Sequence, residues 1–213
     1  MTTALLTNAI WPELTRAAKT ARGTSHIAVA YFSRDAQRRL PLKKRDILVV
    51  NAGMNAVQTG QTSPAALLAL VKRGVGVYSS EDLHAKVFQF GSVVYVGSTN
   101  VSFSSEQRLS EAVLRTNDKK SVSGAKAFIV SRCTHLMTPE YLRVLEKHYP
   151  TGRLFGAPKR RKAVDMNTQS AVMPDTHLVQ LARIPWSEAT LHAAEVGAKV
   201  AEGRRRHDKG YVV

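Results

Sequence analysis

The sequence predicts an α/β protein in which a mixed β-sheet is flanked by helices and followed by a basic C-terminal extension. Apolar segments of strand length alternate with segments of helical periodicity, and this alternation is typical of α/β domains. Of the 213 residues, 44% are hydrophobic and 22% are charged, which are ordinary values for a globular protein. The chain is long enough for one sizeable domain and a further segment.

Helices are expected where apolar residues recur at helical spacing. The first covers residues 3–21, where Pro12 would either kink the helix or start a second one. Ser63 is a good N-cap, and Pro64 suits the first turn of a helix that would end near Gly74. Three further segments have helical character: 34–42, which is a short basic helix or a loop, 121–135 and 139–148.

Strands are expected at runs rich in Val, Ile, Tyr and Phe, or at apolar runs of strand length. These runs are 25–33, 46–51, 75–79, 87–90, 93–96 and 110–116. Gly91 and Ser92 form a natural turn between the fourth and fifth of them, so these two should pair as a hairpin. Residues 52–62 are small and polar and predict a loop.

A domain boundary is expected near residues 150–158, where prolines and glycines interrupt the periodicity. We therefore divide the chain into a first domain, residues 1–150, and a basic C-terminal extension, residues 151–213, whose role the sequence leaves open. Within the extension, a strand is expected over 177–184 and a helix over 187–200.

The formal net charge of +15 is unusual and is distributed over the whole chain. Residues 1–150 contain 20 basic and 10 acidic residues, and residues 151–213 contain 11 and 6. Such an excess favours a polyanionic partner, with nucleic acid first and an acidic membrane surface second. A solvated basic surface without a partner is the simpler alternative.

The single cysteine, Cys133, excludes a disulfide within the chain and any cysteine-based metal site. It is expected to be a small apolar residue buried on the helix over 121–135. The N-terminus lacks the features of a signal peptide, and no apolar run approaches the length of a membrane span. These observations favour a cytoplasmic protein.

Polar residues gather around the predicted hairpin. His84 and Lys86 are two residues apart where a strand begins, so their side chains should point to the same face. Ser98 and Asn100 have the same spacing at the end of the next strand. The hairpin would therefore bring a nucleophile or base, a fixed positive charge and two polar donors to one end of a sheet.

The pattern His84-Ala85-Lys86, then Gly97-Ser98-Thr99-Asn100, then Glu111 resembles the active-site motif of the phospholipase D superfamily. The order of the upstream helices and strands is also similar, and the resemblance covers residues 5–148. The full motif has an aspartate five residues after the lysine, where this chain has Gly91. A branch of metal-independent nucleases in the superfamily lacks this aspartate too, so the chain resembles the nuclease branch more than the lipid-cleaving branch.

The resemblance implies a phospholipase D-like catalytic domain over residues 1–150 and a role for each motif residue. His84 would be the nucleophile that forms a phosphohistidine, and Glu111 would orient its ring, with Glu106 as a competing candidate. Lys86, Ser98 and Asn100 would stabilise the negative charge that develops on the phosphoryl oxygens. No metal or other cofactor is expected, because lysine supplies the positive charge.

Only one copy of the motif is present, whereas a leaving oxygen also needs a general acid. The superfamily solves this with two motifs in one chain or with two single-motif chains around a twofold axis. The resemblance therefore implies a homodimer in which the two copies of His84 act as nucleophile and acid.

Charge and motif together predict a metal-independent endonuclease that acts on nucleic acid, with DNA preferred, and no membrane partner. The alternatives are an inactive nucleic-acid-binding protein and a phosphodiesterase that cleaves phospholipids. Basic residues that could contact phosphates, or could only form a solvated face, are Arg38, Arg39, Lys43, Lys44, Lys159, Arg160, Arg161 and Lys162.

Overall fold

The structure is a computed structural model that describes residues 1–150, 179–180, 200–202 and 210–212. The chain divides into two compact units, Met1–Pro158 and Lys159–Val213. The first unit is built on an eight-stranded sheet with strand order β1-β7-β6-β5-β2-β3-β4-β8. The predicted fold class, an α/β fold with a mixed sheet, is therefore confirmed for this unit.

The elements of the first unit follow one another along the chain with short connections. The strands are β1 (Thr3–Leu6), β2 (His26–Val29), β3 (Ile47–Val50), β4 (Gly76–Ser79), β5 (Lys86–Phe90), β6 (Val93–Gly97), β7 (Val113–Thr116) and β8 (His135–Leu136). The helices are α1 (Ile10–Thr20), α2 (Ala36–Arg39), α3 (Met54–Gln58), α4 (Pro64–Lys72), α5 (Phe103–Gln107), α6 (Lys119–Ser131) and α7 (Pro139–Glu146).

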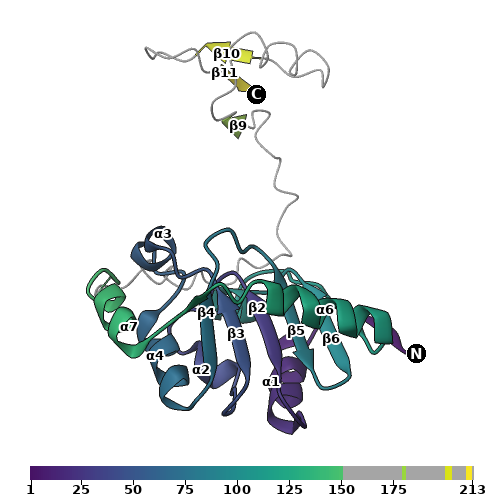
Figure 1. Ribbon diagram of the computed structural model, residues 1–213. Coiled ribbons are helices and arrows are strands. Elements are labelled where there is room, and N and C mark those ends of the chain that lie inside the picture. The colour runs from purple at the N-terminus through teal and green to yellow at the C-terminus, as the bar shows by residue number, and fades with distance from the viewer. Residues whose placement is uncertain (151–178, 181–199, 203–209, 213) are drawn as a thin grey trace. The chain divides into compact units, whose positions relative to one another are not determined.

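Helices cover both faces of the sheet (Figure 1). The larger apolar core lies on the face that packs against α1, α4 and α7, and includes Leu14, Leu67 and Leu142. A smaller core lies on the opposite face, where Ile129 of α6 packs against residues of β2, β3, β5 and β6. Burial on both faces explains why β2 and β3 are largely apolar in the sequence. All five residues of β5 are buried as well, although Lys86 and Gln89 are polar.

The strand directions decide where the ends of the strands meet. β2, β3 and β4 are parallel, and β5 runs antiparallel to β2 and to β6. The carboxyl ends of β2, β3, β4 and β6 therefore lie at the same edge of the sheet as the amino end of β5. This edge carries the candidate site.

The helix predicted over residues 3–21 is wrong in its first part. Residues Thr3–Leu6 form β1, which pairs antiparallel with β7 and covers what would otherwise be an open edge. The helix begins only at Ile10, so Pro12 lies in the first turn, where its missing N–H breaks no intrahelical hydrogen bond.

Other bounds also differ from the predictions: the strand expected over 25–33 ends at Val29, and the one expected over 110–116 begins at Val113. The segment 52–62, expected to be a loop, contains α3, which buries Ala56 and Val57. The helix expected over 121–135 begins two residues earlier, because the Asp118 side chain caps it, and ends at Ser131. Cys133 consequently lies beyond the helix and is only half-buried.

The N-cap predicted for α4 is confirmed. The hydroxyl of Ser63 accepts a hydrogen bond from the backbone N–H of Ala66 at 3.4 Å, and Pro64 occupies the first turn. Among the residues that the structure describes, no helix is long and apolar enough to cross a membrane.

The described part of the second unit is a three-stranded antiparallel sheet with strand order β10-β11-β9. It contains β9 (Val179–Gln180), β10 (Val200–Glu202) and β11 (Gly210–Val212). β9 falls within the strand predicted over 177–184. Val200, predicted to end a helix, begins β10 instead, and the rest of that helix lies outside the described residues.

Candidate active site

His84 and Lys86 meet at the carboxyl-end edge of the sheet. The chain leaves β4 at Ser79 and returns into β5 at Lys86, which pairs with Val29 of β2. The Lys86 Nζ lies 3.2 Å from Nε2 of His84 and donates to the His84 carbonyl oxygen at 2.7 Å. The His84 side chain is exposed, whereas Lys86 is 8% exposed.

This contact favours one tautomer of the neutral His84 ring. An ammonium group has only donors, so Nε2 must accept from Lys86 through its lone pair. In the neutral imidazole the proton then sits on Nδ1. The nitrogen that carries the lone pair is thus held beside a positive charge on an exposed ring, as a nucleophile for an anionic substrate requires.

Burial lowers the pKa of the Lys86 ammonium from its ordinary value, and the negative charge of Glu111 opposes this shift. Two hydrogen bonds tie the ammonium to His84, so the charge is held in place by the fold. A partly desolvated cation interacts more strongly with a developing negative charge than one in bulk water.

The backbone of Tyr31 positions Asn100 beside His84. Extending the β2–β5 register by two residues places Tyr31 opposite His84. The Tyr31 N–H donates to Oδ1 of Asn100 at 3.2 Å, and the Asn100 N–H donates to the Ser105 hydroxyl at 3.2 Å. With Oδ1 engaged, the amide nitrogen of Asn100 is left as an oriented donor for a ligand.

Ser98 and Glu111 are bonded to each other. The Ser98 hydroxyl donates to the Glu111 carboxylate and accepts from the Ala112 N–H at 3.1 Å. Within the described residues no hydrogen bond reaches Nδ1 of His84, so the chain by itself does not form the predicted pair between Glu111 and His84. The Ser98 hydroxyl is likewise engaged by Glu111, although it was expected to face the phosphate.

Gly97 makes this arrangement possible by allowing β6 and β7 to approach closely. A Cβ at position 97 would lie 2.2 Å from the Ala112 carbonyl oxygen and 2.8 Å from the Val113 Cα. Both are backbone atoms, so no side chain could move aside. Only glycine fits here, and its absence of a side chain keeps Ser98 within reach of the residues before β7.

Gly91, which replaces the motif aspartate, lies at the opposite end of the hairpin from the site. It forms the turn between β5 and β6 with φ of +56°, a backbone conformation that favours glycine. Five residues of strand separate it from Lys86, which corresponds to about 16 Å. The departure from the motif therefore removes no group that touches His84 or Lys86.

The fold places the predicted phosphate-binding residues in different parts of the structure. Arg39 lines an open cleft of about 660 Å³ that also borders Asn100, but it forms a 2.6 Å ion pair with Glu106. Glu106 is thereby engaged and does not compete with Glu111. Arg38 is exposed and lies 3.8 Å from Asp35.

Lys43 and Lys44 lie a few residues before β3, at the amino end of the parallel strands and away from His84. The Lys43 ammonium donates to the carbonyl oxygens of Lys19 and Ala21 at the end of α1. The predicted residues Lys159, Arg160, Arg161 and Lys162 lie outside the described part of the chain.

Some residues of the site gave no signal in the sequence. Tyr31 acts through its backbone N–H, which any residue except proline would provide. Phe103 and Arg108 border the same cleft as Asn100, and only their exposure in the folded chain reveals them. Over the described ranges, no group of three His, Cys, Asp or Glu side chains is placed to hold a metal ion.

No protein-family model and no curated protein sequence matches the chain. Its structure is similar to NucT from Helicobacter pylori, with 15% identity, a TM-score of 0.50, and coverage of 64% of this chain and 98% of that one. It is also similar to Nuc from Salmonella typhimurium, a phospholipase D family member, with 17% identity, a TM-score of 0.51, and coverage of 64% and 96%. At these identities the likeness concerns the fold: the chain has a phospholipase D superfamily fold, as its motif predicted.

Proposed function

We propose that this chain is a metal-independent phosphodiesterase that cleaves nucleic acid, with DNA as the preferred substrate. The observation that carries the proposal is the 3.2 Å contact between Nε2 of the exposed His84 and the buried ammonium of Lys86. The net charge of +15 supports a polyanionic substrate. Similarity to a phospholipase D family member supports phosphodiester chemistry.

In the first step, Nε2 of His84 attacks the phosphorus atom and forms a phosphorus–nitrogen bond while the bond to the leaving oxygen breaks. Lys86 and the Asn100 amide donate to the non-bridging oxygens, where negative charge increases in the transition state. Loss of one such donor is expected to lower kcat by roughly 100- to 1,000-fold. The leaving oxygen takes a proton from a general acid.

In the second step, a water molecule attacks the phosphohistidine. The same acid, now a base, takes the water proton, and the phosphorus–nitrogen bond breaks to regenerate His84. We assign the acid to His84 of the partner subunit in a homodimer, because the described residues offer no second histidine beside His84. The two chains would then share one site around a twofold axis.

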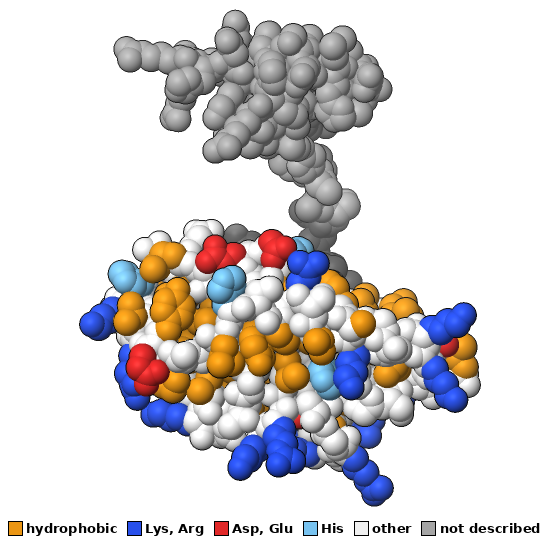
Figure 2. All heavy atoms as spheres, viewed as in Figure 1, with side chains coloured by type: hydrophobic (Ala, Val, Ile, Leu, Met, Phe, Trp, Pro, Cys, Tyr) orange, Lys and Arg blue, Asp and Glu red, His pale blue; other side chains and the backbone are white. Residues whose placement is uncertain are grey.

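An apolar surface supports a dimer. Leu5, Leu114 and Val96 are 65%, 43% and 45% exposed, and they are cross-strand neighbours on β1, β7 and β6. Val96 lies on the α6 side of the sheet, because Val94, two residues earlier, packs in the core beneath α6. Figure 2 shows hydrophobic side chains across the middle of this face, with Lys and Arg mainly at its rim. Exposed apolar patches of this kind mark interaction surfaces.

Cleavage of a labelled oligonucleotide in the presence of EDTA tests the activity. Wild-type protein should cleave it, and His84→Ala should not, whereas His135→Ala, which alters an exposed histidine on β8, should behave as wild type. A requirement for divalent ions, or undiminished cleavage by His84→Ala, would refute the proposal.

Mixing experiments test the shared site. If each site needs His84 from both chains, the activity of mixtures with His84→Ala should follow the square of the wild-type fraction after subunit exchange. A linear dependence would show that one chain carries a complete site. Leu114→Lys should convert the dimer to a monomer in light scattering, because a charge would be buried in the apolar interface.

A nucleic-acid-binding protein without catalysis is the second candidate. The bond between Ser98 and Glu111 favours it, because it leaves Nδ1 of His84 without an orienting carboxylate in the single chain. Salt-sensitive binding of DNA that is never cleaved, by a protein shown to be dimeric, would favour this candidate.

A further inference from the structure

The cleft of about 660 Å³ that begins at the candidate site leads away from it over α5. Tyr31 and Asn100 line its inner end, and Phe103 and Arg108 lie on α5 and at the end of this helix. Its volume falls within the roughly 300–1,000 Å³ of ligand-binding clefts. A substrate whose phosphate reaches His84 would extend into this space.

Phe103 is a large aromatic side chain that the fold leaves 49% exposed in the cleft. The guanidinium carbons of Arg39 and Arg108 lie 5.8 Å and 5.2 Å from its ring centroid. A guanidinium group this close to an aromatic ring makes a favourable cation–π interaction with it. The planar group can also stack on flat ligands. The cleft therefore presents a ring with cations around it.

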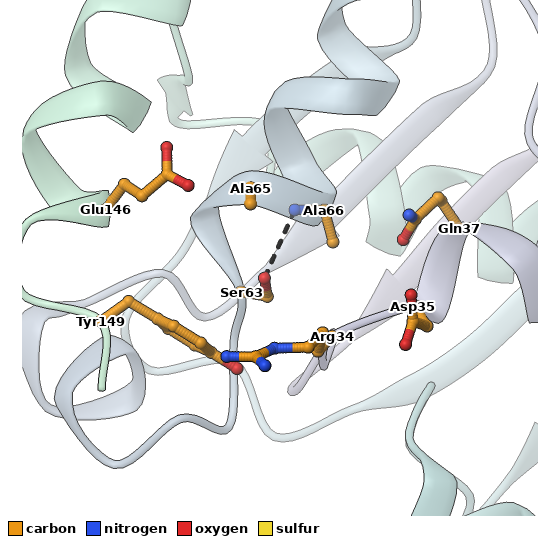
Figure 3. Close-up of a pocket in the computed structure, with 8 residues that line it drawn as sticks. All are labelled: Arg34, Asp35, Gln37, Ser63, Ala65, Ala66, Glu146 and Tyr149. Carbon is orange, nitrogen blue, oxygen red and sulfur yellow. Dashed lines mark hydrogen bonds between the residues drawn. The ribbon is translucent and has the colours of Figure 1, made fainter. Parts of the chain in front are cut away.

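A second aromatic side chain with an arginine lies on the same cleft. The guanidinium carbon of Arg34 is 5.6 Å from the ring centroid of Tyr149, and both residues also line an adjoining pocket of about 310 Å³. Figure 3 shows the Arg34 side chain extended along the Tyr149 ring, with Asp35 and Glu146 at the borders of the pocket. The cleft thus carries two aromatic rings with adjacent positive charge.

The charges of the cleft are predominantly positive. Arg39 is balanced by Glu106, and Asp35 lies beside Arg38. Arg34 and Arg108, in contrast, form no ion pair with any acidic side chain of the described residues. Two guanidinium groups are therefore available for phosphates near the two rings.

We propose that this cleft binds single-stranded nucleic acid, with one base stacked on Phe103 and neighbouring phosphates bound by Arg108 and Arg34. The proposal rests on the proposed function, since the strand would deliver a phosphodiester from the cleft to Asn100 and His84. Aromatic rings beside a positively charged groove are the features with which proteins bind unpaired strands. A duplex keeps its bases stacked inside the helix, so they cannot lie on Phe103.

Binding can be measured separately from cleavage. Full-length His84→Ala protein is titrated against labelled oligothymidylate of about 12 nucleotides, a length within the usual site sizes of roughly 4–16 nucleotides. Fluorescence anisotropy gives Kd for this strand, for oligouridylate and for a duplex of equal length. The same background then carries Phe103→Ala, Phe103→Leu, Phe103→Trp or Arg108→Gln, with Arg73→Gln as a control for charge, because Arg73 is exposed at the opposite end of the sheet.

We expect the single strands to bind at least tenfold more tightly than the duplex. Phe103→Ala and Phe103→Leu should weaken binding roughly 5- to 150-fold, and Phe103→Trp should retain it, because each base stacked on an aromatic ring contributes about 1–3 kcal/mol. Arg108→Gln should weaken binding and reduce its salt dependence, whereas Arg73→Gln should do neither.

Equal affinity for duplex and single strand would overturn the proposal, as would wild-type binding by a folded Phe103→Leu protein. The experiments distinguish failure of this binding proposal from failure of the proposed enzymatic function. Binding that depends on Phe103 in a protein that never cleaves supports the cleft and refutes the enzyme. Cleavage in EDTA by a protein whose oligonucleotide affinity does not change on substitution of Phe103 would support the enzyme and refute the binding cleft.

Discussion

Substitution of Gly97 by alanine tests whether the close approach of β6 and β7 organises the site. The new Cβ would lie 2.2 Å from the Ala112 carbonyl oxygen, whereas real Cβ atoms stay beyond 3.0 Å from such neighbours. The strands must therefore separate by about 1 Å at this end. The 3.1 Å hydrogen bond from the Ser98 N–H to the Ala112 carbonyl would then be stretched or lost.

Overpacking costs about 1–3 kcal/mol, and the weakened hydrogen bond adds about 0.5–1.5 kcal/mol. We expect Gly97→Ala to lose about 2–4 kcal/mol of unfolding free energy, which lowers the urea midpoint by roughly 1–2 M at an m-value of about 2 kcal/mol/M. Because a displacement of about 1 Å can slow catalysis about 100-fold, cleavage should fall as well.

Urea unfolding followed by circular dichroism measures the effect, and Gly124→Ala is the matched control. Gly124 lies on α6, and a Cβ there would meet no atom within 4 Å, so this substitution should stabilise the helix by about 0.5–1 kcal/mol. If Gly97→Ala unfolded at the wild-type midpoint and cleaved at the wild-type rate, the close approach would have no role in the site.

Three further substitutions probe the charges of the fold. Burial lowers the pKa of Lys86, so between this lowered value and pH 10.5 the folded state binds fewer protons than the unfolded state, and the cost of burying the charged ammonium decreases as the pH rises through this range. In urea titrations, Lys86→Met should therefore be more stable than wild type at neutral pH, by a margin that shrinks as the pH rises towards 10.5. Burial also lowers the pKa of His26, so wild-type stability should fall as the pH drops below about 6.5, and His26→Gln should lose this component of the pH dependence. Glu106→Gln removes the acid that balances Arg39 and should tighten oligonucleotide binding roughly two- to fivefold at low salt, with a steeper salt dependence; unchanged affinity would exclude Arg39 from the phosphate path.

The contact between His84 and Lys86 could be predicted because it depends on local geometry. Side chains two residues apart where a strand begins point the same way, and the structure places their nitrogens 3.2 Å apart. The N-cap at Ser63 followed from equally local rules. The hairpin between β5 and β6 was accessible for the same reason, because a turn signal separates two β-rich runs.

The features that could not be predicted depend on partners far away in the sequence. β1 is a strand because β7, more than 100 residues later, offers it an edge, whereas its own four residues suit a helix equally well. Gly97 belongs to the motif, but the motif does not specify that the close approach of β6 and β7 at this glycine pairs Glu111 with Ser98 instead of His84. The cleft at Phe103 arises only when α5 and Tyr31, two residues after the end of β2, come together.

The central claim is that His84 cleaves phosphodiesters without a metal, and one measurement tests it most directly. Wild-type protein is incubated with a labelled single-stranded oligonucleotide in EDTA, quenched within the first turnover and digested for mass spectrometry. We predict cleavage together with a phosphate-linked adduct on the peptide that contains His84, and neither in His84→Ala. Cleavage that stops in EDTA, or that proceeds without an adduct and survives His84→Ala, would contradict the claim.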